Sequence, residues 1–298
     1  MAQFFTTFLQ GIESGAIYAS LALAIVIVYR TSGLLNFAQG EMATLSIFLT
    51  WQFGEWGLPI GLAIGCGLVV SFVIGVVIER LLIRPVGGSE SNALAVVIVT
   101  IGLFLALNGV NAYLWGRNGK ILPNPFPTKI WHVGDVAISA TTIGVLGVLL
   151  VEVVLLALLF QKTKVGLGMR AVVSSKESSR LVGVRVGRML SAGWGLAAVI
   201  GAVAGIMTVA ATPSLTFDPN AMVGALVFGF AAATLGGFDS PVGAVVAGLI
   251  VGLVEKFSAV YVHWIGQDLS VVAAFVVILV VLTVRPQGLF GRVAVVRV

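Results

Sequence analysis

Residues 141–160 read TTIGVLGVLLVEVVLLALLF and carry one charged side chain, that of Glu152. A helix needs about 20 mainly apolar residues to cross the hydrocarbon core of a bilayer. This stretch therefore predicts a membrane-spanning helix. Comparable stretches recur along the chain, and we expect membrane segments at residues 8–29, 36–54, 58–78, 93–115, 141–160, 190–212, 219–236, 241–260 and 268–284.

One of these segments, residues 219–236, differs from the others. It is short and rich in glycine, and Pro241 follows it closely. We expect a broken or re-entrant element there, because a full crossing needs a longer apolar helix. The predicted count is therefore eight or nine membrane segments, some of them broken or re-entrant.

The composition favours the same architecture. Of the 298 residues, 59% are hydrophobic and only 10% are charged, whereas a soluble domain carries about 25% charged residues. The 37 glycines suit membrane helices, where small residues let backbones approach closely. We predict an all-α, polytopic helical membrane protein with a single transmembrane domain, residues 1–298. The N-terminal apolar stretch lacks a basic leader region, so we expect a retained helix and not a secretory signal.

The basic residues predict the orientation in the membrane, because loops on the cytoplasmic side carry an excess of Lys and Arg. With the N-terminus outside and nine segments, 13 basic residues fall on the cytoplasmic side and four on the outer side. The C-terminus is then cytoplasmic. The thirteen are Arg30, Arg80, Arg84, Lys162, Lys164, Arg170, Lys176, Arg180, Arg185, Arg188, Arg285, Arg292 and Arg297, and the four are Arg117, Lys120, Lys129 and Lys256.

Two loops stand out between the apolar segments. Residues 116–140 contain Pro123, Pro125 and Pro127 in alternation, which cannot continue a helix, so we expect an outer loop of irregular structure. Residues 161–189 are the long basic polar segment and are predicted to be cytoplasmic. These loop charges explain the net charge of +5 without nucleic-acid binding.

Several kinds of chemistry are not supported by the sequence. There is no G-x-x-x-x-G-K-[ST] sequence for binding ATP through a P-loop. The two histidines, His132 and His263, belong to no H-E-x-x-H pattern, and Cys66 is the only cysteine. We therefore expect no metal site, no cofactor and no enzymatic activity of the chain itself.

Ionisable residues inside membrane segments usually face the bundle interior or a wet cavity. Glu13 is expected near an outer helix end and Glu152 in a structural pairing with another helix. Glu255 and Lys256 are adjacent, and neighbours on a helix do not face each other, so we expect this pair to mark a helix end at the outer interface.

The most concentrated polar group in an apolar segment lies at residues 33–42, GLLNFAQGEM. Asn36, Gln39 and Gly40 share a face at i, i+3 and i, i+4 spacing, and Glu41 follows. Gly33 and Gly40 permit a broken helix, which membrane proteins tolerate where it lines a cavity. Two interpretations stay open: a translocation pathway or gate, and a polar clamp that only holds the bundle together.

The stretch GLLNFAQGEM resembles the GxxNFAHGE motif of LivH-type permeases, the membrane subunits of bacterial ATP-binding cassette importers for branched-chain amino acids. Three further stretches resemble this family in order: 166–188 its coupling segment, 235–244 (LGGFDSPVGA) its LGGxGSxxGA stretch, and 285–291 (RPQGLFG) its RPxGLFG ending. Gln39 stands where many relatives have histidine, and Ser174 and Ser175 stand where relatives often carry acidic or amide residues.

The resemblance implies a function and a set of partners. The chain would be a multi-pass protein of the bacterial inner membrane that moves branched-chain or other neutral amino acids by alternating access. Its partners would be a second homologous permease, two ATP-binding cassette ATPases and an extracytoplasmic substrate-binding protein. Coupling to the ATPases would run through a short helix, ended by Gly183 or Gly187, and through Arg170, Ala171, Ser179, Gly183 and Val184.

Other functions remain to be weighed against this one. The same family includes permeases for urea and short amides, so the substrate does not follow from the class. An ion-coupled secondary transporter would use Glu41 and Glu152 as proton or sodium carriers. A membrane-embedded enzyme would need a convergent set of reactive residues, which the sequence does not show, and the polar segment 36–41 argues against a purely structural scaffold.

Overall fold

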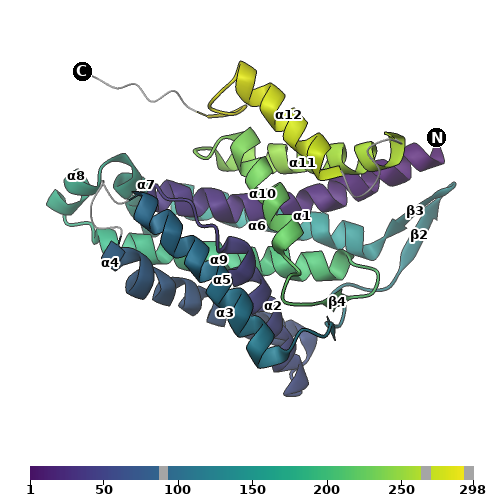
Figure 1. Ribbon diagram of the computed structural model, residues 1–298, viewed down its shortest axis with the longest axis horizontal. Helices are drawn as coiled ribbons and strands as arrows, with labels where there is room; N and C mark the ends of the chain where they lie inside the picture. Colours follow the sequence, from purple (N-terminus) through teal and green to yellow (C-terminus); the bar gives the residue numbers. More distant parts are fainter. Residues whose placement is uncertain (87–92, 263–269, 292–298) are drawn as a thin grey trace.

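The computed structural model describes residues 1–86, 93–262 and 270–291, and these are mainly helical (Figure 1). His263, Arg292 and Arg297 lie outside the described residues. Each predicted membrane segment corresponds to one apolar helix. These helices are α1 (Ala2–Ser32), α2 (Gln39–Glu55), α3 (Ile60–Ile78), α5 (Ala93–Trp115), α6 (Ala140–Lys162), α9 (Val186–Ala211), α10 (Val223–Gly236), α11 (Pro241–Tyr261) and α12 (Ser270–Val284).

The remaining elements are short. A five-residue π-helix, η1 (Glu79–Ile83), and α4 (Arg84–Val86) continue α3, and α7 (Lys164–Ser174) and α8 (Lys176–Leu181) connect α6 to α9. Two antiparallel strand pairs complete the described chain: β1 (Lys120–Ile121) with β4 (Thr216–Phe217), and β2 (Ile130–Val133) with β3 (Val136–Ser139).

Length and hydropathy separate the apolar helices into two groups. Six helices of the described chain are long and apolar enough to cross a membrane: α1, α3 with its continuation, α5, α6, α9 and α11. Helix α2 has 17 residues, α10 has 14 and α12 has 15. The helical membrane architecture therefore agrees with the prediction, whereas the count of eight or nine segments is not confirmed.

Helix α1 is the centre of the bundle. Residues 16–28 are buried on every side, as expected of a helix that is apolar all round. It packs against α11, α9, α10 and α6, and Figure 1 shows it running through the middle of the molecule. The contact with α11 is very close, because a Cβ atom on Gly15 would meet the Leu249 backbone at 2.8 Å.

The outer loop corrects one expectation. Residues 130–139 form a β-hairpin with Ile130 opposite Ser139, so the prediction of irregular structure for the whole of 116–140 was wrong. Gly134 has φ 62° in the turn, a conformation that glycine adopts at little cost. The β-branched and aromatic residues on either side favour strands. The alternating prolines lie before the hairpin and outside its strands.

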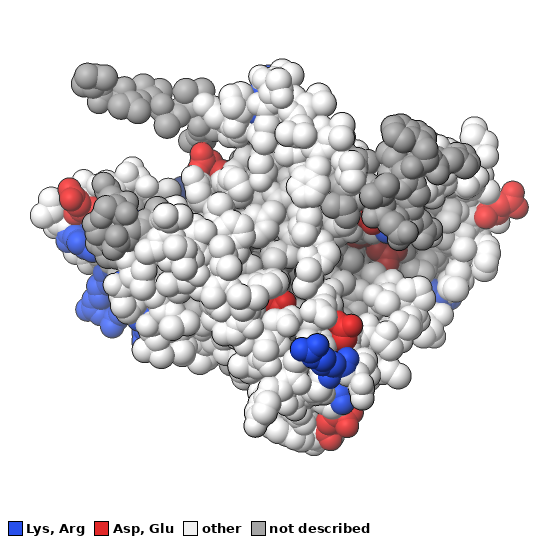
Figure 2. All heavy atoms as spheres, viewed as in Figure 1, with Lys and Arg blue, Asp and Glu red and all other residues white. Residues whose placement is uncertain are grey.

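The charged residues lie mainly at the ends of the bundle. Figure 1 shows the β-hairpin and the N-terminus at one end and α4, α7 and α8 at the other. In Figure 2, Lys and Arg lie over the end with α4 and α8 and in a second group near the lower tip of the molecule, and most of the middle of this face carries no charge. This distribution is typical of a protein whose middle contacts lipid and whose ends contact water.

Candidate functional site

The chain breaks between α1 and α2 inside the bundle. Gly33 ends α1 with φ 76° and donates its backbone N–H to Tyr29 O at 2.7 Å. Helix α2 begins at Gln39, whose side chain reaches the backbone of Ala197. Ala197 lies eleven residues beyond Val186, the start of α9, or about 16 Å along the helix axis. The N-terminus of α2 is therefore at depth within the bundle, as the broken-helix interpretation predicts.

Asn36 and Gln39 form a hydrogen-bonded pair. Asn36 Nδ2 donates to Gln39 Oε1 at 3.0 Å, and Gln39 Nε2 donates to Ala197 O at 2.9 Å. Gly201 of α9 leaves the space that the Gln39 amide occupies. Both side chains are fully buried. These contacts are those of a clamp that joins α2 to α9, and a gate would have to release them.

Gly40 and Glu41 contact different neighbours. A Cβ atom on Gly40 would meet Leu226 Cβ at 3.1 Å and Met222 O at 3.3 Å, so Gly40 allows α10 to approach α2. Glu41 points elsewhere and is fully buried. The four predicted site residues thus lie close in sequence, but only Asn36 and Gln39 are joined directly by a hydrogen bond.

Glu41 belongs to a polar cluster that sequence reasoning missed. Asn108 Nδ2 lies within hydrogen-bonding distance of three oxygen atoms: Glu41 Oε1 at 3.2 Å, Pro219 O at 3.1 Å and Asn220 Oδ1 at 3.1 Å. Asn111, one turn further along α5, is fully buried, and its side chain faces the Glu41 carboxylate closely enough for a hydrogen-bond interaction, although the two do not reach the geometry of a direct hydrogen bond. The sequence carries a signal for this cluster, because Asn108 and Asn111 stand at i, i+3 spacing in an otherwise apolar segment.

This cluster contains unused hydrogen-bonding capacity. Glu41 Oε2 and both polar atoms of the Asn111 side chain are buried and form no direct hydrogen bond. A buried polar group left unsatisfied costs about 1–3 kcal/mol, so such groups usually have a structural or functional reason. The cluster is therefore a better candidate binding site than the fully bonded Asn36–Gln39 pair.

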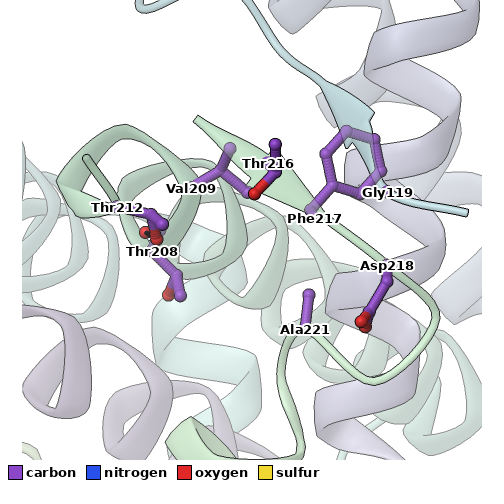
Figure 3. Close-up of a pocket in the computed structure, with 8 residues that line it drawn as sticks. All are labelled: Gly119, Thr208, Val209, Thr212, Thr216, Phe217, Asp218 and Ala221. Atoms are coloured by element: carbon purple, nitrogen blue, oxygen red, sulfur yellow. Dashed lines mark hydrogen bonds between the residues drawn. The ribbon is translucent and has the colours of Figure 1, made fainter. Parts of the chain in front are cut away.

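A small cavity is lined in part by the loop that contacts Asn108 (Figure 3). It has a volume of about 170 Å³ and is lined by Gly119, Thr208, Val209, Thr212, Thr216, Phe217, Asp218 and Ala221. In Figure 3, Thr208 and Thr212 project from α9 on one side and Asp218 lies on the other. Asp218 and Ala221 flank Pro219 and Asn220, so the cavity and the Glu41 cluster share one loop.

A larger cavity, which we call the vestibule, opens at the end that carries the β-hairpin. It has a volume of about 920 Å³, and its walls include Glu13, Asn124, Lys129, Glu255 and Lys256. Its size lies within the range of ligand pockets, about 300–1,000 Å³. Thr212 lines both this vestibule and the smaller cavity.

Glu255 and Lys256 lie in the last two turns of α11, close to a helix end as expected, and line the vestibule. Although adjacent, they form an ion pair with a Nζ–Oε1 distance of 2.9 Å. The long Lys256 side chain folds back, while Tyr18 OH donates to Glu255 Oε2 at 2.7 Å and holds that carboxylate. Glu13 accepts a hydrogen bond from Thr142 Oγ1 at 2.7 Å.

Glu152 does not show the expected pairing directly. It is buried in α6 and interacts with Ser20 of α1, but neither side chain forms a direct hydrogen bond. Within the described chain no group of three or more His, Cys, Asp or Glu residues could hold a metal ion.

The predicted cytoplasmic loop is a compact helical unit. Thr163 Oγ1 accepts from Gly166 N at 3.0 Å to cap α7, and Ser175 Oγ accepts from Ser178 N at 3.1 Å to cap α8. Such side-chain caps are typical of helix N-termini. Residues Leu181 and Val182, at the end of α8, are 88% and 76% exposed. A pair of exposed aliphatic side chains at a polar end of the molecule indicates a contact surface.

The five predicted coupling residues do not form one surface. Arg170 is exposed and Ala171 half-buried. Ser179 is buried, and its carbonyl accepts from Val184 N at 2.9 Å. Gly183 has φ 83° in this turn, so a glycine does follow the short helix as expected. Gly187 lies inside α9 and ends no helix, because α9 already begins at Val186.

An ion-pair network, the Glu79 network, ties the first turns of α9 to the continuation of α3. Arg84 binds both carboxylate oxygens of Glu79, at 3.1 and 2.7 Å, and donates to Gly187 O at 2.7 Å. Ser191 Oγ donates to Glu79 Oε2 at 2.6 Å. From α8, Lys176 Nζ donates to Ser32 O at 3.3 Å. The region from α8 to the start of α9 is thus held to the C-terminal ends of α1 and α3.

Comparison with known proteins identifies the family of this chain. The family described as branched-chain amino acid transport system / permease component matches residues 7–282. The chain belongs to this permease family. It is 28% identical to the high-affinity branched-chain amino acid transport system permease protein LivH of Escherichia coli K12, over 98% of each chain. It is also 28% identical to BraD of Pseudomonas aeruginosa, over 95% of this chain and 94% of the relative.

A more distant relative is the probable branched-chain amino acid transport permease LivH of Methanocaldococcus jannaschii, 24% identical over 94% of this chain and 91% of the relative. No solved structure gives a significant match. The permease is a transporter component and not an enzyme. In its structure the stretches 235–244 and 285–291 lie together, since Leu289 N donates to Leu235 O at 2.8 Å and Phe290 N to Gly236 O at 3.2 Å.

Proposed function

We propose that this chain is the membrane permease subunit of an ATP-binding cassette importer for branched-chain or other neutral amino acids. The family and the names of its relatives support the substrate class. The observation that carries the proposal is the exposed α7–α8 unit at the basic end of the bundle. A permease without its own P-loop needs an external motor, and this unit offers a surface on which the motor can act.

The complete importer would contain four kinds of subunit: this permease, a second homologous permease, ATPase subunits acting as a pair and an extracytoplasmic substrate-binding protein. Helix α8 and the exposed Leu181 and Val182 would insert into a cleft of the ATPase. Arg170, Ala171, Gly183 and Val184 would contact it or shape the unit, while Ser179 closes its turn. The buried Glu79 network would then pass movement of α9 to α3.

Transport would follow alternating access, in which the helices around α2 rearrange. Asn36, Gln39, Gly40 and Glu41 are the proposed pathway or gate, because the discontinuous start of α2 lies at depth between α9, α10 and α5. An Asn36→Leu/Gln39→Leu double variant that assembles at wild-type yield is expected to lose most uptake. Normal uptake by this variant would contradict the gate and leave only a clamp.

The proposed location is the inner membrane of a bacterial cell, with the N-terminus outside and the C-terminus in the cytoplasm. The β-hairpin and the vestibule would then face the binding protein, and α8 would face the ATPases. The larger number of basic residues at the α8 end supports this orientation, in line with the positive-inside rule.

Purification of the chain from native membranes in mild detergent, followed by mass spectrometry, tests the assembly. We expect P-loop ATPases and a second permease in the same complex. Their binding protein is then assayed for branched-chain amino acids, with urea and acetamide as competing ligands. Recovery of the chain alone or as a homo-oligomer, together with ion-driven uptake by the chain alone, would contradict the importer and favour a secondary transporter.

A further inference from the structure

The Glu41 cluster combines three groups that a ligand could satisfy. Glu41 Oε2 is an acceptor that carries negative charge, and the Asn111 side chain has one acceptor and a donor group, all buried and without a direct hydrogen bond. Glu41 comes from α2 and Asn111 from α5, two helices in contact. The unmet groups therefore lie at the contact between two helices.

The chemistry of these groups selects a ligand class. A primary ammonium group has three N–H donors and a positive charge, so it can donate to Glu41 Oε2 and to Asn111 Oδ1 together. The Asn111 Nδ2 group can donate to a carboxylate. A divalent metal ion would need about six oxygen ligands, more than these two side chains supply. The set matches the zwitterionic head group of an α-amino acid.

Asn108 joins Glu41 to the loop 218–221 in the structure. Its Nδ2 group contacts Glu41 Oε1, Pro219 O and Asn220 Oδ1 at once, and it has only two N–H donors to share among them. Asn220 is exposed, and its neighbours Asp218 and Ala221 line the cavity of Figure 3. Release of Asn108 would free the loop 218–221 from Glu41 and connect the cavity to the buried groups.

We propose that Glu41 and Asn111 bind the ammonium and carboxylate groups of a zwitterionic amino acid in transit, and that Asn108 latches this site shut against loop 218–221. The inference rests on the proposed function and deepens it. It assigns recognition of the head group to this permease and leaves recognition of the side chain to other parts of the importer.

The test uses the purified complete importer in proteoliposomes with ATP inside and its amino-acid-loaded binding protein outside. Initial uptake and binding-protein-stimulated ATP hydrolysis are measured for wild type, Glu41→Gln, Glu41→Asp, Asn111→Ala and the control Glu152→Gln. Glu152 is a matched control because it is also a buried membrane glutamate without a direct hydrogen bond.

We expect Glu41→Gln and Asn111→Ala to lower uptake at least about tenfold, a size typical of losing a hydrogen bond to a charged group. Stimulated ATP hydrolysis should stay within about twofold of wild type, since the ATPase contacts are unchanged. Glu41→Asp should keep part of the uptake and Glu152→Gln nearly all of it. Wild-type uptake by Glu41→Gln, or an equal loss of uptake and ATP hydrolysis, would overturn the proposal.

A second measurement needs no variant and so does not depend on variant assembly. A diazirine analogue of leucine is photo-crosslinked to the wild-type importer during turnover, and the labelled peptides are mapped. Labelling of the peptides that contain Glu41 and Asn111 is expected, and labelling confined to the walls of the vestibule would contradict the site. If the wild-type importer takes up no amino acid with ATP, the proposed function itself is wrong, which the variants alone would not show.

Discussion

At the scale of single residues, polar side chains inside the bundle form hydrogen bonds with residues that are far away in sequence. Tyr18 donates a hydrogen bond to Glu255, and Ser191 donates one to Glu79. Ser71 Oγ donates to Ser46 Oγ at 2.7 Å. In hydrocarbon such groups have no water to bond with, so interhelical pairs are the usual solution. These pairs fix which helix faces meet.

The Glu79 network leads to a prediction of stability. Replacing Arg84 with Gln leaves the buried Glu79 carboxylate without its cation, and we expect a loss of about 2 kcal/mol in the free energy of unfolding. This is less than the roughly 3–5 kcal/mol for a fully buried pair, because the Arg84 side chain is 43% exposed and water screens it. Thermal unfolding of the detergent-solubilised chain measures the change.

Arg80→Gln is the matched control for this prediction. Arg80 makes only one long hydrogen bond to the network, to Ser191 Oγ at 3.4 Å, so its replacement should cost about 0.5 kcal/mol or less. Equal melting temperatures for Arg84→Gln and wild type would show that the ion pair does not stabilise the bundle.

Single residues also show how much of the candidate site could be predicted from the sequence. Spacing identified Asn36 and Gln39 as neighbours, because i, i+3 contacts are local. It could not identify Ala197 as the partner of Gln39, because that contact depends on how distant helices pack. The ion pair between the adjacent Glu255 and Lys256 was not predicted, because helix geometry keeps neighbours apart. A flexible lysine can still reach back to its neighbour when a third residue, Tyr18, holds the carboxylate.

At the scale of elements, the α1–α11 contact depends on glycine. Gly11 and Gly15 of α1 lie against Gly252 and Gly248 of α11, respectively. A Cβ atom on Gly252 would overlap the Gly15 backbone. Small residues spaced by four let membrane helices approach closely. The central helix of the bundle is therefore fixed to α11 by backbone proximity.

Substitution of Gly252 with Ala should separate these helices. We expect a loss of about 1–3 kcal/mol, the usual cost of overpacking, seen as a lower melting temperature in detergent. Gly102→Ala is the matched control, because Gly102 lies within α5 with nothing within 4 Å of an added Cβ. Its melting temperature should stay equal or rise slightly, since Ala favours helix over Gly. The same loss in both variants would refute the close-contact argument.

The α7–α8 unit gives a prediction about assembly. A Leu181→Glu/Val182→Glu variant places two charges on the proposed ATPase contact, and burying them there would be unfavourable. We expect the variant to fold but to lose the ATPase during co-purification. Ile121→Glu, also exposed but in the outer strand β1, should retain it. ATPase recovery that is equal in both would exclude α8 as the docking element.

Elements were predictable where a periodic or uniform apolar signal defined them. The predicted segment 93–115 coincides with α5, and 241–260 differs from α11 by one residue. The β-hairpin was missed because three prolines dominated the interpretation of its loop. The number of crossings could not be predicted in this way, since α2 and α10 have 17 and 14 residues and a full span needs about 20.

At the scale of the whole molecule, the two ends carry different functions in our account. The outer end holds the vestibule and the hairpin, and the inner end holds α8 and the basic residues. In a Cys66→Ser background, Thr128→Cys and Ser178→Cys place one thiol at each end. A membrane-impermeant maleimide added to intact spheroplasts should label Thr128→Cys and spare Ser178→Cys. The opposite labelling pattern would reverse the orientation.

The central claim is that this permease moves amino acids with energy from partner ATPases. The most direct measurement is leucine uptake by proteoliposomes that contain the co-purified complex and receive loaded binding protein outside. We predict uptake when hydrolysable ATP is enclosed, and none with a non-hydrolysable analogue or with a proton or sodium gradient alone. Uptake that needs only an ion gradient, and that the isolated chain performs equally well without ATP, would contradict the account.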